Sequence, residues 1–195
     1  IGSAAFPLTN FTVTAINPGG NTTFTVPLQV LGSGENVWTV ISGVSGQDVG
    51  VAHGGLMIDK TTNSTSLYTG GHVIGNMDGV TSPAPANLAA FISKYDLNGN
   101  RSWTRMLGVS GANTDSPTIQ VDPSGNVYMT GNTYGNLDGN TLTGNPNAFI
   151  SKFDSSGVKQ WTKTKGASTY SAGIAISVDS AGNSFLVGEM KGGTL

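Results

Sequence analysis

Hydrophobic and polar residues alternate between Phe149 and Trp161, with one break in the middle. Phe149, Ser151 and Phe153 lie at every second position, which is the period of a β-strand. Residues 154–157 then read Asp-Ser-Ser-Gly. An Asp side chain can accept bonds from amides just ahead of it, and a Gly three residues later can take the positive φ that closes a type I turn with a bulge. The segment is predicted to be a β-hairpin.

The same hairpin pattern occurs elsewhere in the chain. Phe91 to Trp103 repeats it 58 residues earlier (149 against 91), and a degraded copy with two extra turn residues runs from Phe24 to Trp38. The Asp-x-x-Gly signal itself occurs four times, starting at Asp96, Asp122, Asp154 and Asp179. Four turns of one kind favour a repeat protein built from short antiparallel strands.

The order of the strand patterns predicts an all-β fold, a β-propeller built from four-stranded antiparallel blades. Residues 1–22 are interpreted as an N-terminal tail with an extra strand. The propeller part is divided into a half-blade, two full blades and a second half-blade, at 23–50, 51–108, 109–166 and 167–195. In the first half-blade, Thr23–Leu31 is expected to pair with Val37–Ser42. A β-solenoid or an open sandwich is the alternative.

The number of blades creates a difficulty for a closed ring. Two full blades and two half-blades amount to three, whereas propellers typically have about 4 to 8. Three solutions remain open: the chain is part of a longer propeller, two chains share one six-bladed ring, or half-blades join head to tail into a polymer. A homo-oligomer or a longer parent chain is therefore expected.

Composition narrows the class of partner. Of 195 residues, 37% are hydrophobic and 29 are Gly, which suits strands and tight turns, and no amphipathic helix is evident. The net charge of −2 gives no basic footprint for nucleic acid. The absence of Cys removes disulfides, thiolate metal sites and a Cys nucleophile. No apolar run reaches the roughly 18 residues that a membrane helix needs.

The repeated residues resemble those of the bacterial beta-propeller repeat (SBBP) family. The matching elements are Ala148–Asp154 with Gly157 and Trp161, and Val121–Gly131. The resemblance covers about Trp38 to Met190, and the N-terminal 35 residues depart from it. It implies a secreted or cell-surface bacterial protein, and it implies no shared catalytic residues.

Candidate ligand-binding residues occur once per repeat. Trp38, Trp103 and Trp161 could form an aromatic platform for sugar rings, or could pack between adjacent blades, since a buried Trp supplies a large apolar area. Asp48 and Asp115 follow Gly-Val-Ser-Gly segments that link one blade to the next. Such linkers are expected at the ring face where propellers bind ligands.

Two short motifs, Asn76-x-Asp78-Gly and Asn136-x-Asp138-Gly, resemble part of a calcium loop. Oxygen ligands at alternate positions followed by Gly suit a hard cation. Both motifs lack the upstream Asp and the downstream Glu of the full pattern. The alternative is a tight turn without metal. His53, the other His at position 72 and the absent Cys provide too few ligands for a zinc site.

The expected function is therefore non-enzymatic. The sequence predicts a surface or secreted module for binding or adhesion that recognises a glycan or a protein through ring-face loops. The alternative is a self-assembling subunit whose half-blades pair between chains. A propeller-based polysaccharide-active enzyme would need paired carboxylates on one face. Several of the 11 acidic residues are instead assigned to turns.

Overall fold

The computed structural model describes residues 9–17, 20–28, 49–59, 66–96 and 98–192. The chain divides into two compact units, Ile1–Val40 and Ile41–Leu195. We describe each unit by itself and call them the N-terminal and the C-terminal unit. Apart from one short 3-10 turn, the regular structure described in both units consists of β-strands. The predicted all-β class is confirmed.

The N-terminal unit contains one hairpin. β1 (Thr9–Asn17) pairs with β2 (Gly20–Leu28) in antiparallel register. The strand that begins near Thr23 is thus paired on one edge with β1. Its expected partner, Val37–Ser42, lies outside the described residues, so the half-blade at 23–50 stays a prediction.

The first sheet of the C-terminal unit has four strands in the order β3-β4-β5-β6. They are β3 (Val49–Asp59), β4 (Ser66–Ile74), β5 (Leu88–Tyr95) and β6 (Arg101–Leu107), and all neighbours are antiparallel. The β5–β6 pair is the earlier copy of the repeated hairpin, which confirms that prediction. Within the described part of the chain, no helix is long and apolar enough to cross a membrane.

The second sheet repeats this order and a third sheet begins it again. The second sheet consists of β7 (Thr114–Val121), β8 (Val127–Thr133), β9 (Asn147–Phe153) and β10 (Lys159–Lys165). A 3-10 turn, η1 (Leu137–Gly139), lies in the connection from β8 to β9. The third sheet pairs β11 (Tyr170–Val178) with β12 (Ser184–Lys191) and has two strands.

The Asp-x-x-Gly turns form as predicted, because one carboxylate satisfies the whole loop. In the turn that starts at Asp122, Oδ1 accepts bonds from the amides of Ser124 and Asn126, both at 2.9 Å. Gly125 donates its amide to the carbonyl of Asp122 at 2.9 Å and has a φ of 78°. The turns at Asp96, Asp154 and Asp179 repeat these bonds.

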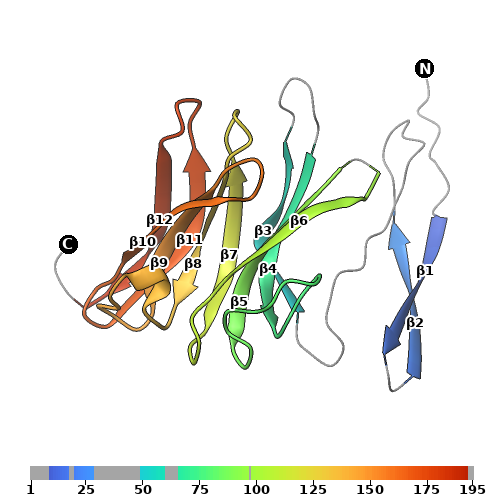
Figure 1. Ribbon diagram of the computed structural model, residues 1–195, viewed down its shortest axis with the longest axis horizontal. Helices are drawn as coiled ribbons and strands as arrows, with labels where there is room; N and C mark the ends of the chain where they lie inside the picture. The colour runs from blue at the N-terminus through green and yellow to red at the C-terminus, as the bar shows by residue number, and fades with distance from the viewer. Residues whose placement is uncertain (1–8, 18–19, 29–48, 60–65, 97, 193–195) are drawn as a thin grey trace. The chain divides into compact units, whose positions relative to one another are not determined.

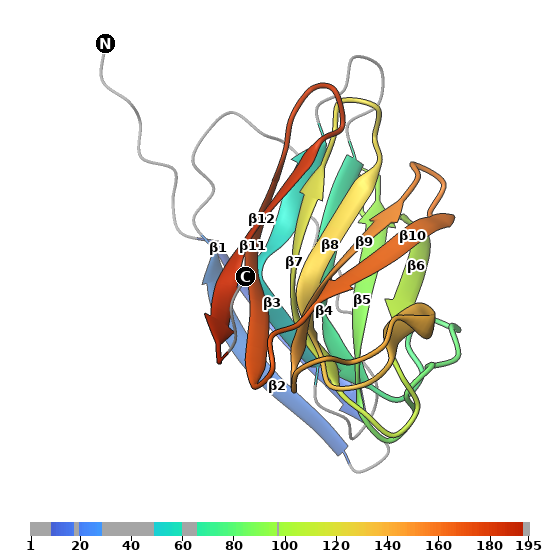
Figure 2. The ribbon, with the colours of Figure 1, turned by 90° about the vertical axis from the view of Figure 1, so that its left-hand side faces the viewer.

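The three sheets pack in chain order (Figure 1). β7 contacts β3, β4 and β5 of the first sheet, and β11 contacts β7, β8 and β9 of the second. Figure 2 shows the first strands of the sheets (β3, β7 and β11) on one side and the fourth strands (β6 and β10) on the other. The sheets therefore share one orientation.

A continuous core lies between the first and second sheets. It contains ten buried side chains, among them Ile92, Ile119, Met129, Leu137 and Phe149. The backbones approach closely here, since a Cβ on Gly70 would lie 2.8 Å from Cγ2 of Ile119. A side chain at position 70 would push the two sheets apart, so the close packing of the sheets requires Gly at this position.

Candidate functional site

Trp103 lies under the turn of the following sheet. Its indole Nε1 donates to the carbonyl of Ser155 at 3.4 Å, and its ring meets that of Tyr68 edge to face with centroids 6.0 Å apart. A Cβ on Gly157 would lie only 2.9 Å from Cδ2 of Trp103. These contacts support the interpretation that Trp103 packs between sheets, because the turn covers the ring on which a sugar would have to stack.

Two cations hold the same turn in place. Arg105 donates from Nε to the carbonyl of Gly157 at 2.7 Å and from Nη2 to that of Ser156 at 3.4 Å. Lys94 donates to the carbonyl of Ser155 at 3.2 Å. Because these donors bond backbone carbonyls of the turn, the contact between the second sheet and the first does not depend on the side chains of the turn.

Trp161 occupies the equivalent place in the second sheet, but its surroundings differ. Its ring meets that of Tyr128 with centroids 6.2 Å apart, and the Lys163 amine lies 5.5 Å from its centroid. The described part of the third sheet consists of β11 and β12, and no corresponding turn bonds to Trp161 among the described residues. The third candidate, Trp38, lies outside the described residues.

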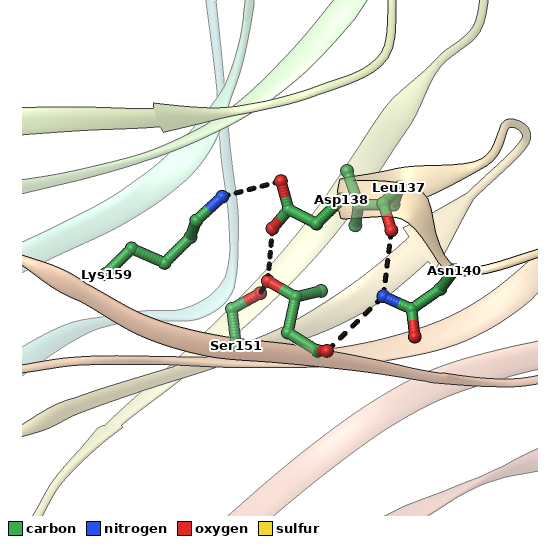
Figure 3. A network of polar contacts seen from close by, with 6 residues as sticks. Leu137, Asp138, Asn140, Ser151 and Lys159 are labelled. Atoms are coloured by element: carbon green, nitrogen blue, oxygen red, sulfur yellow. Dashed lines mark hydrogen bonds and ion pairs between the residues drawn. The ribbon is translucent and has the colours of Figure 1, made fainter.

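The two predicted calcium motifs place their Asp residues at positive φ, 57° for Asp78 and 51° for Asp138. Gly follows each Asp, also at positive φ, so the pair forms a tight turn of the kind that favours Asp-Gly. Oδ1 of Asp138 bonds Nζ of Lys159 and Oδ2 accepts from Oγ1 of Thr162, both at 2.5 Å (Figure 3). Protein groups thus occupy both oxygens.

Asp78 has the same partners in the first sheet. It pairs with Nη1 of Arg101 at 2.8 Å and accepts from Oγ1 of Thr104 at 2.7 Å. Because the hydroxyl of Thr104 donates its proton to Asp78, the hydroxyl of Ser93 must donate the 2.7 Å bond between Ser93 and Thr104. An equivalent Ser151–Thr162 bond of 2.7 Å exists in the second sheet (Figure 3). In each of the two sheets, the Asp-Gly turn between the second and third strands is therefore bonded to the fourth strand in the same way.

The two Asn residues of these motifs also have structural partners. The side-chain oxygen of Asn76 accepts from the amide of Ser82 at 2.9 Å, and that of Asn136 accepts from the amide of Leu142 at 2.8 Å. Within the described ranges, no group of three or more His, Cys, Asp or Glu could hold a metal ion. These contacts support the tight-turn interpretation.

Asp115 lies at the junction of the second and third sheets, whereas Asp48 lies outside the described residues. Oδ1 of Asp115 accepts from Nδ2 of Asn132 at 3.3 Å, and Oδ1 of Asn132 accepts from the amide of Gly173 at 3.2 Å. Asn132 thus connects the carboxylate to the first strand of the next sheet. Asp115 was predicted as a linker residue, and the structure places it beside the linker end of β7.

Two tyrosines accompany Asp115, and the sequence analysis did not select either. Tyr134 is 38% exposed, and its pKa is raised by burial first and then by the charges of Asp115 and Tyr170. The amine of Lys191 lies 5.6 Å from the ring centroid of Tyr170. We call these three residues the Asp115–Tyr134–Tyr170 cluster. In the sequence, Tyr134 directly follows β8 and Tyr170 begins β11, and no motif joins these two positions to Asp115.

A small cavity opens where the third sheet meets Ala148 and Lys165 of the second. Its volume is about 230 Å³, and its lining includes Ala148, Lys165, Ser171, Leu186, Glu189 and Met190. In the β11–β12 register, Ser171 pairs with Met190, the next pair after Tyr170 and Lys191. The cavity therefore combines an apolar lining with one cationic and one anionic side chain. Because successive residues of a strand point to opposite faces, Tyr170 and Lys191 are not part of this lining.

The middle of the chain has a recognisable family pattern. Residues 102–138 match the beta-propeller repeat, SBBP. The match runs from β6 through β7 and β8 into η1, so it includes the junction between the first and second sheets and ends at Asp138. It confirms the resemblance predicted from the sequence. No curated protein sequence matches the chain.

Proposed function

We propose that the first and second sheets are two successive blades of a β-propeller and that the third sheet is the inner half of another. The SBBP match supports this, as do the repeated strand order and the common orientation of the three sheets. In this arrangement β3, β7 and β11 would line the propeller axis, and β6 and β10 would lie at its rim.

We further propose that the chain is a non-enzymatic binding module that recognises a glycan at the Asp115–Tyr134–Tyr170 cluster. The observation that carries this proposal is the 38% exposed Tyr134 beside a carboxylate and a second phenol. An aromatic ring with a polar tip can stack on a sugar face, while carboxylate and amide groups bond its hydroxyls. A secreted or cell-surface location stays a prediction from the family resemblance.

The partners of three acidic residues make these residues unsuited to hydrolysis or elimination. Glycoside hydrolysis needs two carboxyl groups facing one bond. Asp78 and Asp138 are tied to Thr hydroxyls and cations, and Asp122 is occupied by the amides of its own turn. Asp115 differs from them because it accepts a hydrogen bond from the side-chain amide of Asn132.

A glycan array followed by titration calorimetry tests this function. We expect binding to at least one glycan class, and we expect Tyr134→Ala and Asp115→Asn to weaken it about tenfold or more, as for loss of an anchor residue. Val158→Ala is the matched control, since Val158 is 55% exposed and lies beside the turn at the other ends of the strands. An empty array, or variants that bind like the wild type, would contradict the proposal.

A further inference from the structure

Asp115 and Tyr134 lie on the same face of the second sheet. Asp115 pairs with Asn132 in the β7–β8 register, so the two side chains point to the same side. The amide of Tyr134 bonds the carbonyl of Asn113 at 2.9 Å, which continues this ladder one residue beyond β8. Because Tyr134 follows Asn132 by two positions, its side chain shares that face. One face thus carries a carboxylate, an amide and a phenol.

The accessibility of Tyr134 belongs to its position in the sheet. Ile74 in the first sheet is the equivalent residue, since both Ile74 and Tyr134 directly precede the sequence Gly-Asn-x-Asp-Gly. Tyr134 is 38% exposed, and Ile74 is also partly exposed although a sheet of four strands packs on the first sheet. The access to Tyr134 therefore does not depend on how many strands the third sheet has.

Three tyrosine rings of the C-terminal unit already have a protein amine over them. The amine lies between 5.1 and 5.6 Å from the ring centroid in the pairs Lys152–Tyr128, Lys94–Tyr68 and Lys191–Tyr170. The quadrupole of an aromatic ring attracts an ammonium group that lies over its face. In the part of the chain that the structure describes, no Lys or Arg lies over the ring of Tyr134. Tyr134 thus offers an accessible ring without a protein cation.

The carboxylate on the same face has no protein cation either. Within the described ranges Asp115 forms no ion pair, and its hydrogen bond comes from the neutral side-chain amide of Asn132 at 3.3 Å. By contrast, two other carboxylates are neutralised by the ion pairs Asp78–Arg101 and Asp138–Lys159. An uncompensated carboxylate beside an open aromatic ring is an arrangement that binds an organic ammonium group.

We propose that the ligand of the Asp115–Tyr134–Tyr170 cluster is a glycan with a free amino group. This inference rests on the glycan-binding function proposed above and names the class of glycan. The protonated amine of the sugar donates to the carboxylate of Asp115 and lies against the ring of Tyr134, as the lysines lie against the other tyrosines. An N-acetylated sugar brings a neutral amide to the same place, and the carboxylate of Asp115 repels an anionic sugar.

Titration calorimetry with a matched pair of oligosaccharides tests the inference. The probes are a glucosamine tetramer and its fully N-acetylated counterpart. We expect the wild-type chain to bind the glucosamine tetramer about tenfold more tightly, since an exposed ion pair and a cation–π contact each contribute a few-fold. Asp115→Asn should remove this preference, because the variant has no carboxylate for the amine.

Asp179→Asn is the matched control for the change in charge. It removes one negative charge at the far end of β11, roughly 25 Å along the strand from Tyr170, which is well beyond the screening length of about 8 Å. This variant should keep the preference of the wild type for the glucosamine tetramer. Circular dichroism should show that both variants are folded.

The outcomes separate this inference from the proposed function. If the wild type binds both tetramers equally, or if Asp115→Asn keeps the preference, the inference is wrong and glycan binding itself stands. A tetralysine peptide that binds as tightly as the glucosamine tetramer would show that the cluster recognises an ammonium group without a sugar, which also overturns the inference. If neither tetramer binds while the array shows another glycan, this inference alone fails, whereas an empty array contradicts the proposed function as well.

Discussion

Gly157→Ala is the substitution that examines sheet stacking most selectively. Gly157 has a φ of 81°, and its carbonyl accepts the 2.7 Å bond from Arg105. A Cβ at this position would lie 2.9 Å from Cδ2 of Trp103 and 3.1 Å from Nε of Arg105. The substitution therefore combines a backbone penalty with a collision between two sheets, and the two costs can be separated by a control.

Gly182→Ala supplies the backbone penalty alone. Gly182 also has a φ of 81° and ends the same kind of turn, but its added Cβ would come no nearer than 3.5 Å to another group, the hydroxyl of Tyr128. A left-handed backbone conformation costs an L-residue roughly 1–2 kcal/mol. Ala also restricts the unfolded chain more than Gly does, which offsets roughly 0.4–1 kcal/mol of that cost. We expect Gly182→Ala to lower the free energy of unfolding by about 1 kcal/mol.

The additional cost at Gly157 measures the packing of the turn on Trp103. Overfilling a packed contact costs roughly 1–3 kcal/mol, so Gly157→Ala should destabilise the protein by about 2–4 kcal/mol. Urea unfolding of both variants, followed by circular dichroism, gives the difference. If both variants lose the same free energy with equal denaturant slopes, the turn does not press on the first sheet and the stacking argument fails.

Three further predictions concern the turns and the rim. Trp103→Ala should cost about 3 kcal/mol and Trp161→Ala about 2 kcal/mol in urea unfolding, because only the first loses a turn contact; equal losses would argue against this. Asp138→Asn should cost about 1 kcal/mol by the same assay, because it removes the charge that faces Lys159 and leaves one acceptor oxygen for two donors; no loss would mean that the network is unimportant. Stability should fall as the pH drops below the ordinary Asp pKa of 3.8. Hydrogen bonds to side chains and amides hold the pKa of three turn carboxylates lower in the folded protein, so the unfolded chain takes up protons first. Stability that is unchanged between about pH 5 and pH 3 would contradict this. These three carboxylates belong to Asp96, Asp154 and Asp179.

The features that the sequence predicted well are local. An Asp, a Gly three residues later and alternating residues on either side determine a hairpin within about fifteen residues, and the β5–β6 and β9–β10 hairpins formed as expected. The order of strands in each sheet followed from counting these hairpins along the chain. Short loops make sequential strands neighbours, so little else had to be known.

The features that the sequence did not predict depend on distant partners. The pairing of β2 with β1 follows a two-residue connection that resembles many other Gly-rich segments of this chain. The bonds of Asp138 to Thr162 and Lys159 cross more than twenty positions, so the motif alone left calcium and a tight turn open. Trp103 and Trp161 are equivalent in sequence, and only the packing of the third sheet distinguishes them.

The most direct test of the stacked arrangement is a nuclear Overhauser measurement on the wild-type chain. The indole proton of Trp103 can be assigned by comparison with a Trp103→Phe sample, and the account predicts cross-peaks from it to Ser155, whose carbonyl accepts the indole bond at 3.4 Å. Cross-peaks to Ser155 would establish that the second sheet lies on the first. If the assigned indole proton shows cross-peaks within β4, β5 and β6 alone, successive sheets do not stack as described.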